Sequence, residues 1–351
     1  MRRPLFKSSS VRDTSKLSKI SLPTCLTMRK LRYMKLAPPY SHPPLNFRGD
    51  IARFVEDDSY SIGFGLQWKK WANTQFDSYT GVSITEDRAK RMFGNLFDEI
   101  PGSLVLEAGC GAGRFSEVLL KNHAILTAFD LTQAVESNYS IHGDQKNFRV
   151  FQGSIFEIPF ALNSFDFVFC PGVVQHTPNP RKSIESLWGQ VKPGGWLVFD
   201  QYRFNLSTLT RTAWVFRIFL RRINPERAMI FTNLLVKSML PVHKRVHNNK
   251  VLEKILFRIS PITAHHSSYK EFSDELQNEW AQLNTHDNLT DFHKKHTTVK
   301  RAVKILKRLH AFSIEVNVMP YTVEIRAQKP SRDNENFSPK VVIKKSRGVS
   351  G

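Results

Sequence analysis

Short apolar runs alternate with stretches of helical spacing through the middle of this 351-residue chain. A run that is apolar on consecutive positions is typical of a strand in a parallel sheet covered on both faces. Between two such runs, residues 114–121 have the spacing of an amphipathic helix. The alternation predicts an α/β fold with a mostly parallel sheet. The runs lie at 104–106, 124–129, 148–151, 164–170 and 191–200.

The last part of the chain has a different pattern, in which apolar and polar residues alternate strictly. Residues 312–318 and 321–327 alternate on either side of Met319-Pro320, which predicts two strands of an antiparallel hairpin. Residues 300–310 have helical spacing and come directly before it. We therefore expect a helix and a hairpin to follow the parallel part of the sheet.

The first predicted strand ends at an acidic residue and leads into three alternating glycines, Gly109, Gly111 and Gly113. Glycine permits positive φ and lets the backbone approach a ligand closely, and the free N–H groups of the next helix point into the turn. A dinucleotide-binding turn would have its third glycine at position 114, which is arginine here. No Gly-Lys-Ser/Thr sequence follows, which excludes a typical nucleoside triphosphate loop.

This spacing resembles motif I of the class I S-adenosylmethionine (SAM)-dependent methyltransferases. In that family the acidic residue lies near the amino-acid end of the cofactor, and the glycines pass beside it. The second run ends at Asp130, where a carboxylate can accept hydrogen bonds from both hydroxyls of a ribose. The family usually has aspartate at the position of Ser154, where it meets the adenine amino group. The resemblance assigns cofactor binding to Glu107, Ala108, Gly109, Gly111, Gly113, Asp130, Leu131, Ser154 and Ile155.

The resemblance covers residues 100–203 and implies a doubly wound, mostly parallel sheet of seven strands. It also implies a C-terminal antiparallel hairpin and allows a helical insertion after the fifth strand. The chain then divides into a disordered basic extension (1–47), an N-terminal helical and aromatic cap (48–100), a SAM-binding Rossmann-like core (101–203), a cationic helical insertion or lid (204–298), a last helix with the hairpin (299–329) and a disordered tail (330–351).

The positive charge of the chain is concentrated outside the predicted core. The sequence carries 51 Lys and Arg against 31 Asp and Glu, a net charge of +20. Counted in the same way, residues 97–200 carry 7 − 11 = −4, whereas residues 1–49 carry 11 − 1 = +10 and residues 201–260 carry 12 − 2 = +10. The net positive charge therefore predicts anionic partners only for the two flanking segments, and it predicts none for the core.

The spacing of the cysteines and the hydropathy of the chain predict where in the cell the protein is located. The three cysteines are far apart, which indicates neither a disulfide framework nor a metal site and favours a reducing compartment. No window of 18 apolar residues is free of charge, so we expect no membrane-spanning helix. We expect a cytoplasmic protein, with peripheral contact to an anionic membrane as a further candidate. Three interpretations are open for residues 1–47. The start is misassigned and the real first residue is Met28 or Met34, or the segment is a flexible basic arm, or it is an organelle transit peptide.

Aromatic residues gather before the glycine turn, in residues 59–81. Their F-G-x-Q-W and T-Q-x-D-S arrangement looks like the segment before motif I in bacterial methyltransferases of cell-surface polysaccharide and other glycan pathways. Such rings can cover the cofactor or stack on a substrate ring, with ordinary packing against the sheet as the alternative. We also expect Asp87 and Arg88 to begin a helix here. The aromatic residues are Phe64, Trp68, Trp71 and Tyr79.

Residues 205–260 are helical in spacing, cationic and apolar at once, and Pro225 restarts a helix within them. The family commonly places substrate-determining insertions after the fifth strand, so this segment is a candidate lid. A basic amphipathic stretch also fits an anionic membrane surface, or a lipid-linked or phosphorylated substrate. The third interpretation is a helical subdomain with solvated basic faces.

His176 is the candidate catalytic base. It follows the fourth predicted strand, at the carboxyl edge where ligands bind in such sheets, and a hydroxyl acceptor benefits from a base within hydrogen-bond reach. A structural loop histidine is the alternative. Tyr202 and Arg203 lie just past the fifth strand and can orient a substrate. His265 and His266 form a second pair, but no acidic or Cys partner has convincing metal-site spacing, so we predict no metal.

The loop after the fourth strand also bears on the methyl acceptor. It reads Cys170-Pro171-Gly172-Val173, not the N-P-P-Y type of amino-group methyltransferases that act on nucleic acid. The sequence therefore predicts a SAM-dependent methyltransferase acting on a hydroxyl or carbon of a small molecule or of a sugar or glycan precursor. Two alternatives stay open: a quinone or lipid methyltransferase at a membrane surface, and an RNA-associated protein, methylating or binding only, whose basic flanks contact phosphates.

Overall fold

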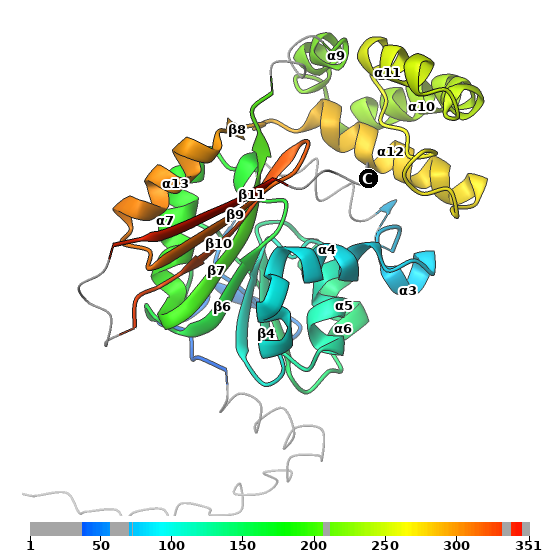
Figure 1. Cartoon of the computed structure of the whole chain (residues 1–351). Coiled ribbons are helices and arrows are strands. Elements are labelled where there is room, and N and C mark those ends of the chain that lie inside the picture. Colours follow the sequence, from blue (N-terminus) through cyan, green and yellow to red (C-terminus); the bar gives the residue numbers. More distant parts are fainter. Residues whose placement is uncertain (1–36, 57–69, 72, 206–210, 332–337, 346–351) are drawn as a thin grey trace, which may run out of the picture.

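A single sheet of eleven strands runs through the computed structural model of this chain (Figure 1). The structure describes residues 37–56, 70–71, 73–205, 211–331 and 338–345. Strand order is β1-β2-β5-β4-β3-β6-β7-β10-β9-β11, and β8 pairs with β7. The strands are β1 (Asn46–Arg48), β2 (Ile51–Arg53), β3 (Leu104–Ala108), β4 (Ile125–Asp130), β5 (Phe148–Gln152), β6 (Phe165–Cys170), β7 (Val191–Arg203), β8 (His296–Thr297), β9 (Ser313–Val318), β10 (Thr322–Gln328) and β11 (Lys340–Lys345).

The centre of the sheet is parallel. From β2 to β7, each strand pairs in parallel with its neighbour in the order, whereas β10 is antiparallel to both β7 and β9. The predicted α/β fold is confirmed as one with a sheet of parallel and antiparallel strands. The sheet is wider than the predicted seven strands, because β1 and β2 extend one edge, β11 extends the other and β8 joins β7.

Helices cover both faces of this sheet (Figure 1). α4 and α5 bury Phe93 and Leu119 on one face, and α7 and α13 bury Leu187 and Leu306 on the other. Each face thus has its own apolar core, as a parallel sheet requires. The helices are α3 (Asp77–Thr80), α4 (Ile84–Phe93), α5 (Arg114–Lys121), α6 (Val135–His142), α7 (Pro180–Gln190), α9 (Ala213–Leu220), α10 (Pro225–Val246), α11 (Lys250–Ile259), α12 (Asp274–Thr290) and α13 (Val299–Arg308), with 3-10 turns η1 (Gly94–Glu99) and η2 (Val174–His176).

The helical insertion, α9 to α12, connects β7 to β8 and lies beyond the carboxyl ends of the strands (Figure 1). α12 is its inner helix and buries Trp280, Ala281 and Leu283. Among the described helices, none is long and apolar enough to cross a membrane. Strand order reverses between β3 and β6, so the insertion covers the end of the sheet where ligands bind in doubly wound folds.

Parts of both segments that we predicted to be disordered have a defined structure. β11 pairs in parallel with β9, so residues 340–345 of the predicted tail form a strand. Its Val-Val-Ile run suits a strand, and β9 offers an edge to pair with. At the other end, the Tyr40 ring packs against Phe54 and Phe160, which gives residues near the start of the described chain a fixed place. Residues 1–36, 332–337 and 346–351 lie outside the described residues.

The cap helix α4 begins at Ile84, three residues before the predicted start at Asp87. The cause is a capping interaction from outside the helix. Both carboxylate oxygens of Asp77 accept hydrogen bonds from backbone N–H groups, one from Thr85 and one from Glu86, each at 2.8 Å. A carboxylate at a helix N-terminus satisfies donors that have no partner within the helix.

Candidate functional site

The glycine turn adopts the conformation that its sequence predicts. Gly109, Gly111 and Gly113 have φ values of 74°, 53° and 102°, in the left-handed region that L side chains rarely adopt. A Cβ atom at Gly109 would lie 2.3 Å from Val173, and one at Gly113 would lie 2.4 Å from Asn138. The turn therefore packs tightly against the loop after β6 and against α6, and side chains at these two positions would not fit.

Asp130, at the end of β4, holds the same turn. Its Oδ2 accepts the N–H of Gly111 at 2.9 Å, and its Oδ1 accepts both the N–H and the hydroxyl of Thr132 at 2.8 Å. Each carboxylate oxygen has two lone-pair positions, and these three bonds fix the orientation of the carboxylate at the end of β4. Thr132 was not predicted, although a threonine two residues after an aspartate is a common local turn partner.

Glu107, at the end of β3, is fully buried. Its Oε2 accepts a hydrogen bond from the Ser116 hydroxyl at 2.6 Å. Within the described residues, Oε1 is buried without a hydrogen-bond partner, and burial raises the pKa of Glu107 to about 8 despite the opposing bond from Ser116. A buried acceptor without a donor requires an explanation. An ammonium group is such a donor, so the site fits the amino-acid end of the cofactor that the resemblance implies.

Of the remaining predicted cofactor residues, Ala108 is buried at the end of β3, and the other three follow the ends of β4 and β5. The Leu131 carbonyl accepts the side-chain amide of Gln152 at 2.8 Å, which ties the two strand ends together. The Ser154 hydroxyl accepts the N–H of Phe156 at 3.2 Å, so it braces its own loop, and Ile155 is buried beside it. Ser154 can still donate its proton, but it lacks the second acceptor oxygen of an aspartate.

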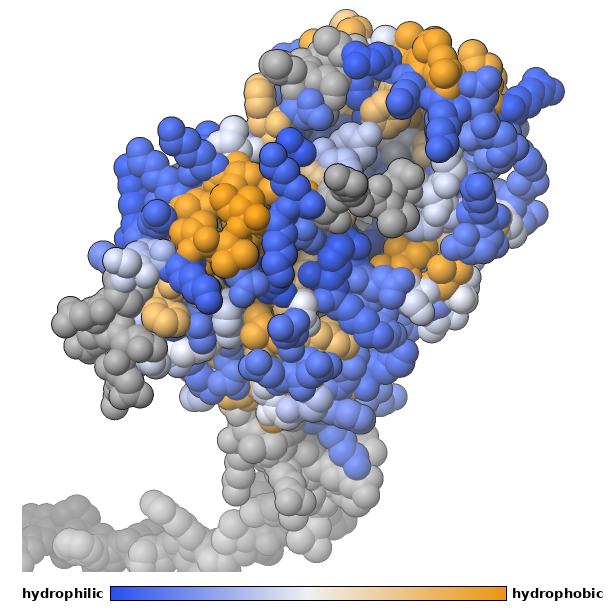
Figure 2. Space-filling model, in the orientation of Figure 1, coloured by the Kyte–Doolittle hydropathy of each residue, from blue (hydrophilic) through white to orange (hydrophobic). Residues whose placement is uncertain are grey.

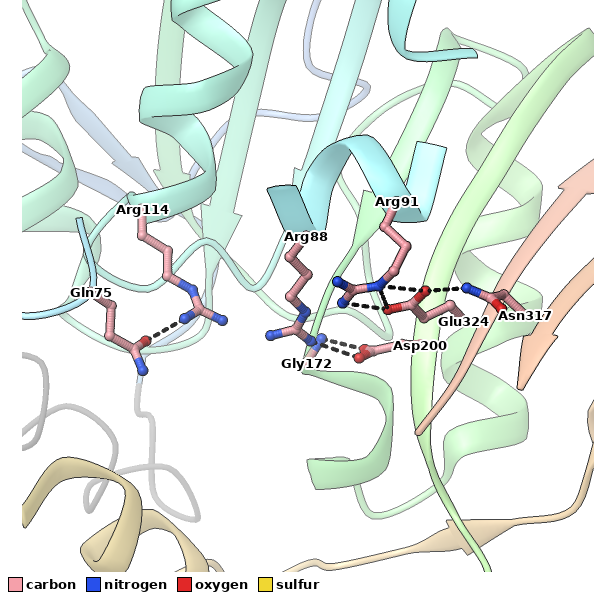
Figure 3. A network of polar contacts seen from close by, with 8 residues as sticks. All are labelled: Gln75, Arg88, Arg91, Arg114, Gly172, Asp200, Asn317 and Glu324. Atoms are coloured by element: carbon pink, nitrogen blue, oxygen red, sulfur yellow. Dashed lines mark hydrogen bonds and ion pairs between the residues drawn. The ribbon is translucent and has the colours of Figure 1, made fainter. Parts of the chain in front are cut away.

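Two arginines of α4 form ion pairs with acidic residues of neighbouring strands (Figure 3). Arg88 donates to Asp200 of β7 at 2.7 Å, and the same carboxylate accepts the N–H of Gly172 at 2.6 Å. Arg91 forms an ion pair with Glu324 of β10 at 2.9 Å. Asp200 is almost fully buried, so its pairing with Arg88 offsets the desolvation of the carboxylate. These contacts lock the cap helix to the loop after β6.

A third arginine, Arg114, opens α5 directly after Gly113 (Figure 3). Its guanidinium donates to the Gln75 side chain at 2.7 Å and lies 4.7 Å from the centre of the Phe115 ring, with the Arg88 guanidinium 5.6 Å from the same centre. Burial lowers the pKa of Arg114 to about 9, and Arg88 adds to that shift. The N-terminal end of a helix dipole is positive, as is the guanidinium of Arg114. Both therefore favour an anionic group at this place.

His176 forms a close pair with a residue of the insertion. Its Nδ1 lies 2.7 Å from Oδ2 of Asp291, whose side chain is 1% exposed. His176 lies at the end of η2, and its N–H donates to the carbonyl of Val173, the residue that packs against Gly109. The histidine–aspartate pair, His176 with Asp291, therefore lies on the loop that contacts the glycine turn. Tyr202 packs edge-on against the His176 ring at 5.4 Å.

The surroundings of the histidine–aspartate pair are charged and buried. Burial alone would lower the pKa of His176, but the charge and hydrogen bond of Asp291 raise it above its usual value. Burial raises the pKa of Tyr202 well above its usual range and lowers that of Lys294 to about 8. Arg217 reaches Asp291 at 3.8 Å. A carboxylate on Nδ1 orients the imidazole and fixes its tautomer, as in hydrolase triads.

The predicted residues outside these clusters have other surroundings. Arg203 donates to the Met319 carbonyl at 3.3 Å, so it braces the turn between β9 and β10. His265 bonds the Asn284 side chain at 3.0 Å, and burial lowers its pKa to about 4. His266 lies next to it on the insertion. In the part of the chain that the structure describes, no three His, Cys, Asp or Glu side chains are grouped to hold a metal ion.

The aromatic cap residues divide between packing and exposure. Trp71 is buried and its ring centre lies 6.3 Å from that of His286 in α12, which agrees with ordinary packing. Tyr79 is 54% exposed. The indole of Trp280 donates to the Thr74 carbonyl at 2.8 Å, so the cap contacts the insertion directly. Phe64 and Trp68 lie outside the described residues.

Comparison with known proteins adds an independent finding. Residues 106–199 match the family profile of a methyltransferase domain. Ubiquinone biosynthesis O-methyltransferase from Coxiella burnetii (strain Dugway 5J108-111) is 30% identical over 125 residues, 34% of this chain and 53% of the relative. The enzyme of the same name from Pseudomonas fluorescens (strain Pf0-1) is 27% identical over 184 residues, covering 49% and 76%. The chain thus spans about half the length of the first of these relatives.

Solved structures resemble the chain more weakly in sequence. A SAM-dependent methyltransferase described from Methanococcus maripaludis is 15% identical with a TM-score of 0.42, covering 80% of this chain and 98% of that one. Magnesium protoporphyrin IX methyltransferase from Synechocystis PCC 6803, solved with S-adenosylhomocysteine, is 14% identical with a TM-score of 0.44, covering 77% and 98%.

Proposed function

We propose that this chain, whose residues 106–199 form a class I SAM-dependent methyltransferase domain, methylates a hydroxyl group of a small molecule. The histidine–aspartate pair is the observation that carries the proposal. A hydrogen bond from Nδ1 to Asp291 at 2.7 Å sets the tautomer in which Nε2 of His176 is the proton acceptor. A base on the loop beside the glycine turn favours a hydroxyl as the methyl acceptor, because a hydroxyl has a proton that the base can remove.

The cofactor of this domain is SAM, which supplies a methyl group already activated on a sulfonium. The residues of the chain then bind SAM and align the acceptor hydroxyl with the bond between sulfur and methyl. Glu107 would hold the amino-acid end through its unpartnered oxygen, and Asp130 would hold the ribose hydroxyls. His176 would remove the hydroxyl proton, and the charge of Asp291 would stabilise the resulting imidazolium.

Two classes of small molecule are candidates for the acceptor. The name of the curated relatives, ubiquinone biosynthesis O-methyltransferase, favours a hydroxylated ring of quinone type. The aromatic segment before motif I favours a sugar or glycan precursor, because of its likeness to bacterial enzymes of those pathways. A ring hydroxyl on an aromatic system is the more acidic of the two, and a histidine base matches it better.

Methyl transfer from labelled SAM tests the proposal. We expect the full chain to transfer label to a catechol probe. His176→Ala should lower kcat by about 10²-fold or more with an unchanged dissociation constant for SAM, measured by calorimetry. His42→Ala, at an exposed histidine near the start of the described chain, is the matched control and should keep full turnover. If only a hexose probe takes up label, the acceptor belongs to the glycan class. If His176→Ala keeps full turnover, His176 is not the base.

A further inference from the structure

The outer helices of the insertion carry large apolar side chains that are exposed. More than half of the large apolar residues that are exposed in the described chain lie between positions 215 and 259. α11 is the clearest case, because none of its residues is buried. Val251, Ile255 and Ile259 are 67%, 52% and 59% exposed, and their i, i+4, i+8 spacing makes one continuous stripe along the helix.

Basic residues lie directly beside this apolar stripe. Lys250, Lys254 and Arg258 have the same i, i+4, i+8 spacing, one position earlier, and each is exposed. Figure 2 shows orange apolar surface bordered by blue at the end of the molecule where Figure 1 places α10 and α11. In α10, Ile230 and Leu234 are 62% and 59% exposed and extend the apolar surface. Residues 201–260 together carry twelve basic and two acidic residues.

We propose that this face, formed by the exposed apolar and basic residues of α10 and α11, docks the protein on an anionic membrane surface. An amphipathic helix binds such a surface by placing its apolar stripe below the headgroups and its Lys and Arg side chains among them. A large exposed apolar patch with a cationic border marks an interaction site rather than a solvated face. The charge of the face selects anionic lipid over neutral lipid.

RNA is the other polyanion that a basic face could bind, and the chemistry of this face disfavours it. Single-stranded nucleic acid binds to aromatic side chains on which bases stack. The exposed stripe of α11 is aliphatic, made of valine, leucine and isoleucine, and among the described residues of the face the one large exposed apolar ring is Phe231 of α10, 42% exposed. Aliphatic side chains gain from transfer into hydrocarbon but offer bases no stacking platform.

Vesicle co-sedimentation of the full chain tests the proposal without any turnover, so its outcome is separate from that of methyl transfer. We expect binding to phosphatidylcholine vesicles that contain phosphatidylglycerol, weakened by added salt, and at least roughly tenfold weaker binding to phosphatidylcholine alone. Two double variants address the two components of the face. Val251→Glu with Ile255→Glu removes the stripe, and Lys250→Glu with Lys254→Glu reverses the charge.

Matched controls lie away from the insertion. Leu162→Glu changes an apolar residue that is 69% exposed, before the amino end of β6. Lys300→Glu with Lys304→Glu reverses two exposed lysines at the same spacing on α13. We expect both face variants to lose vesicle binding by roughly tenfold or more while they keep SAM binding, and both controls to bind vesicles like the wild-type chain.

Three results would overturn the proposal. The wild-type chain would fail to bind anionic vesicles, or the face variants would bind them as well as the controls do. A wild-type dimer that Val251→Glu with Ile255→Glu dissociates, seen by sedimentation velocity, would assign the face to a second copy of the chain. Binding of a random single-stranded RNA that is lost in Lys250→Glu with Lys254→Glu, without vesicle binding, would assign it to nucleic acid.

Discussion

The α/β core and the helical insertion use apolar helix faces in opposite ways. In the core, α5 buries Phe115, Val118 and Leu119 against the sheet. In the insertion, α11 has an apolar stripe of similar length and buries none of it. Charge follows the same division, with −4 over residues 97–200 and +10 over residues 201–260. The core helix α5 packs its apolar face beside the glycine turn, whereas the outer helices of the insertion expose theirs.

The chemistry lies where these two regions meet. His176 belongs to the core and Asp291 to the end of the insertion, and Trp280 of α12 bonds the backbone of the cap. In the proposed function, the core alone would bind SAM but would leave His176 without its Asp291 partner. The predictions below separate the two contributions.

The largest effect should come from the core turn. Gly111→Arg places a long side chain at a residue with φ of 53° whose N–H bonds Asp130, so we expect SAM binding to be abolished in calorimetry, at least about 100-fold weaker. Gly102→Arg is the control, because Gly102 also has positive φ, 75°, but has open space around it. If the two variants bind SAM equally well, the turn is not the cofactor site.

The next effect concerns the ligand-free stability of the core. Burial raises the folded-state pKa of Glu107 to about 8 from a model-compound value of 4.5. Folding then takes up a proton between these values, so stability falls as pH rises from 4.5 to 8, by up to about 4 kcal/mol. Glu107→Gln removes this dependence, and its Tm at pH 8 should exceed that of the wild-type chain, with little difference near pH 4.5.

Glu185→Gln, at an exposed pair with Arg181 on α7, should change neither curve. SAM binding should weaken in Glu107→Gln although stability rises, because the amide carries no charge to attract an ammonium group. A Glu107→Gln chain that is less stable at pH 8, as judged by thermal unfolding, would contradict the assignment of a buried, unpaired carboxylate.

The smallest effect should come from the contact between core and insertion. Asp291 raises the pKa of His176, and the neutral amide of Asp291→Asn would stabilise the imidazolium less. The acidic limb of the kcat/KM profile should therefore shift to lower pH. Its plateau should fall by about tenfold or more, since the imidazole loses its orienting partner. Asp287, Lys294 and Tyr202 also face His176, and the substitution leaves them in place. An unshifted limb would show that Asp291 has only a structural role.

Local features of the site were predictable from the sequence, and contacts between distant residues were not. The glycine turn, Glu107 and Asp130 lie at strand ends set by short-range spacing. The Asp291 partner of His176 is 115 residues away and was not predicted. The one signal in the sequence that could have pointed to it is the density of titratable residues in 287–296. The Gln75 partner of Arg114 is 39 residues away, before the turn.

The sequence by itself determined the strands, the positive-φ turn and the acidic residues beside it, because backbone sterics and apolar period act within a few residues. Tertiary structure decided what the insertion does. Only when α12 packs beside the core does Asp291 reach His176, and the packing of the insertion leaves the apolar stripe of α11 exposed. These outcomes depend on how distant segments pack together, which no local pattern of residues encodes.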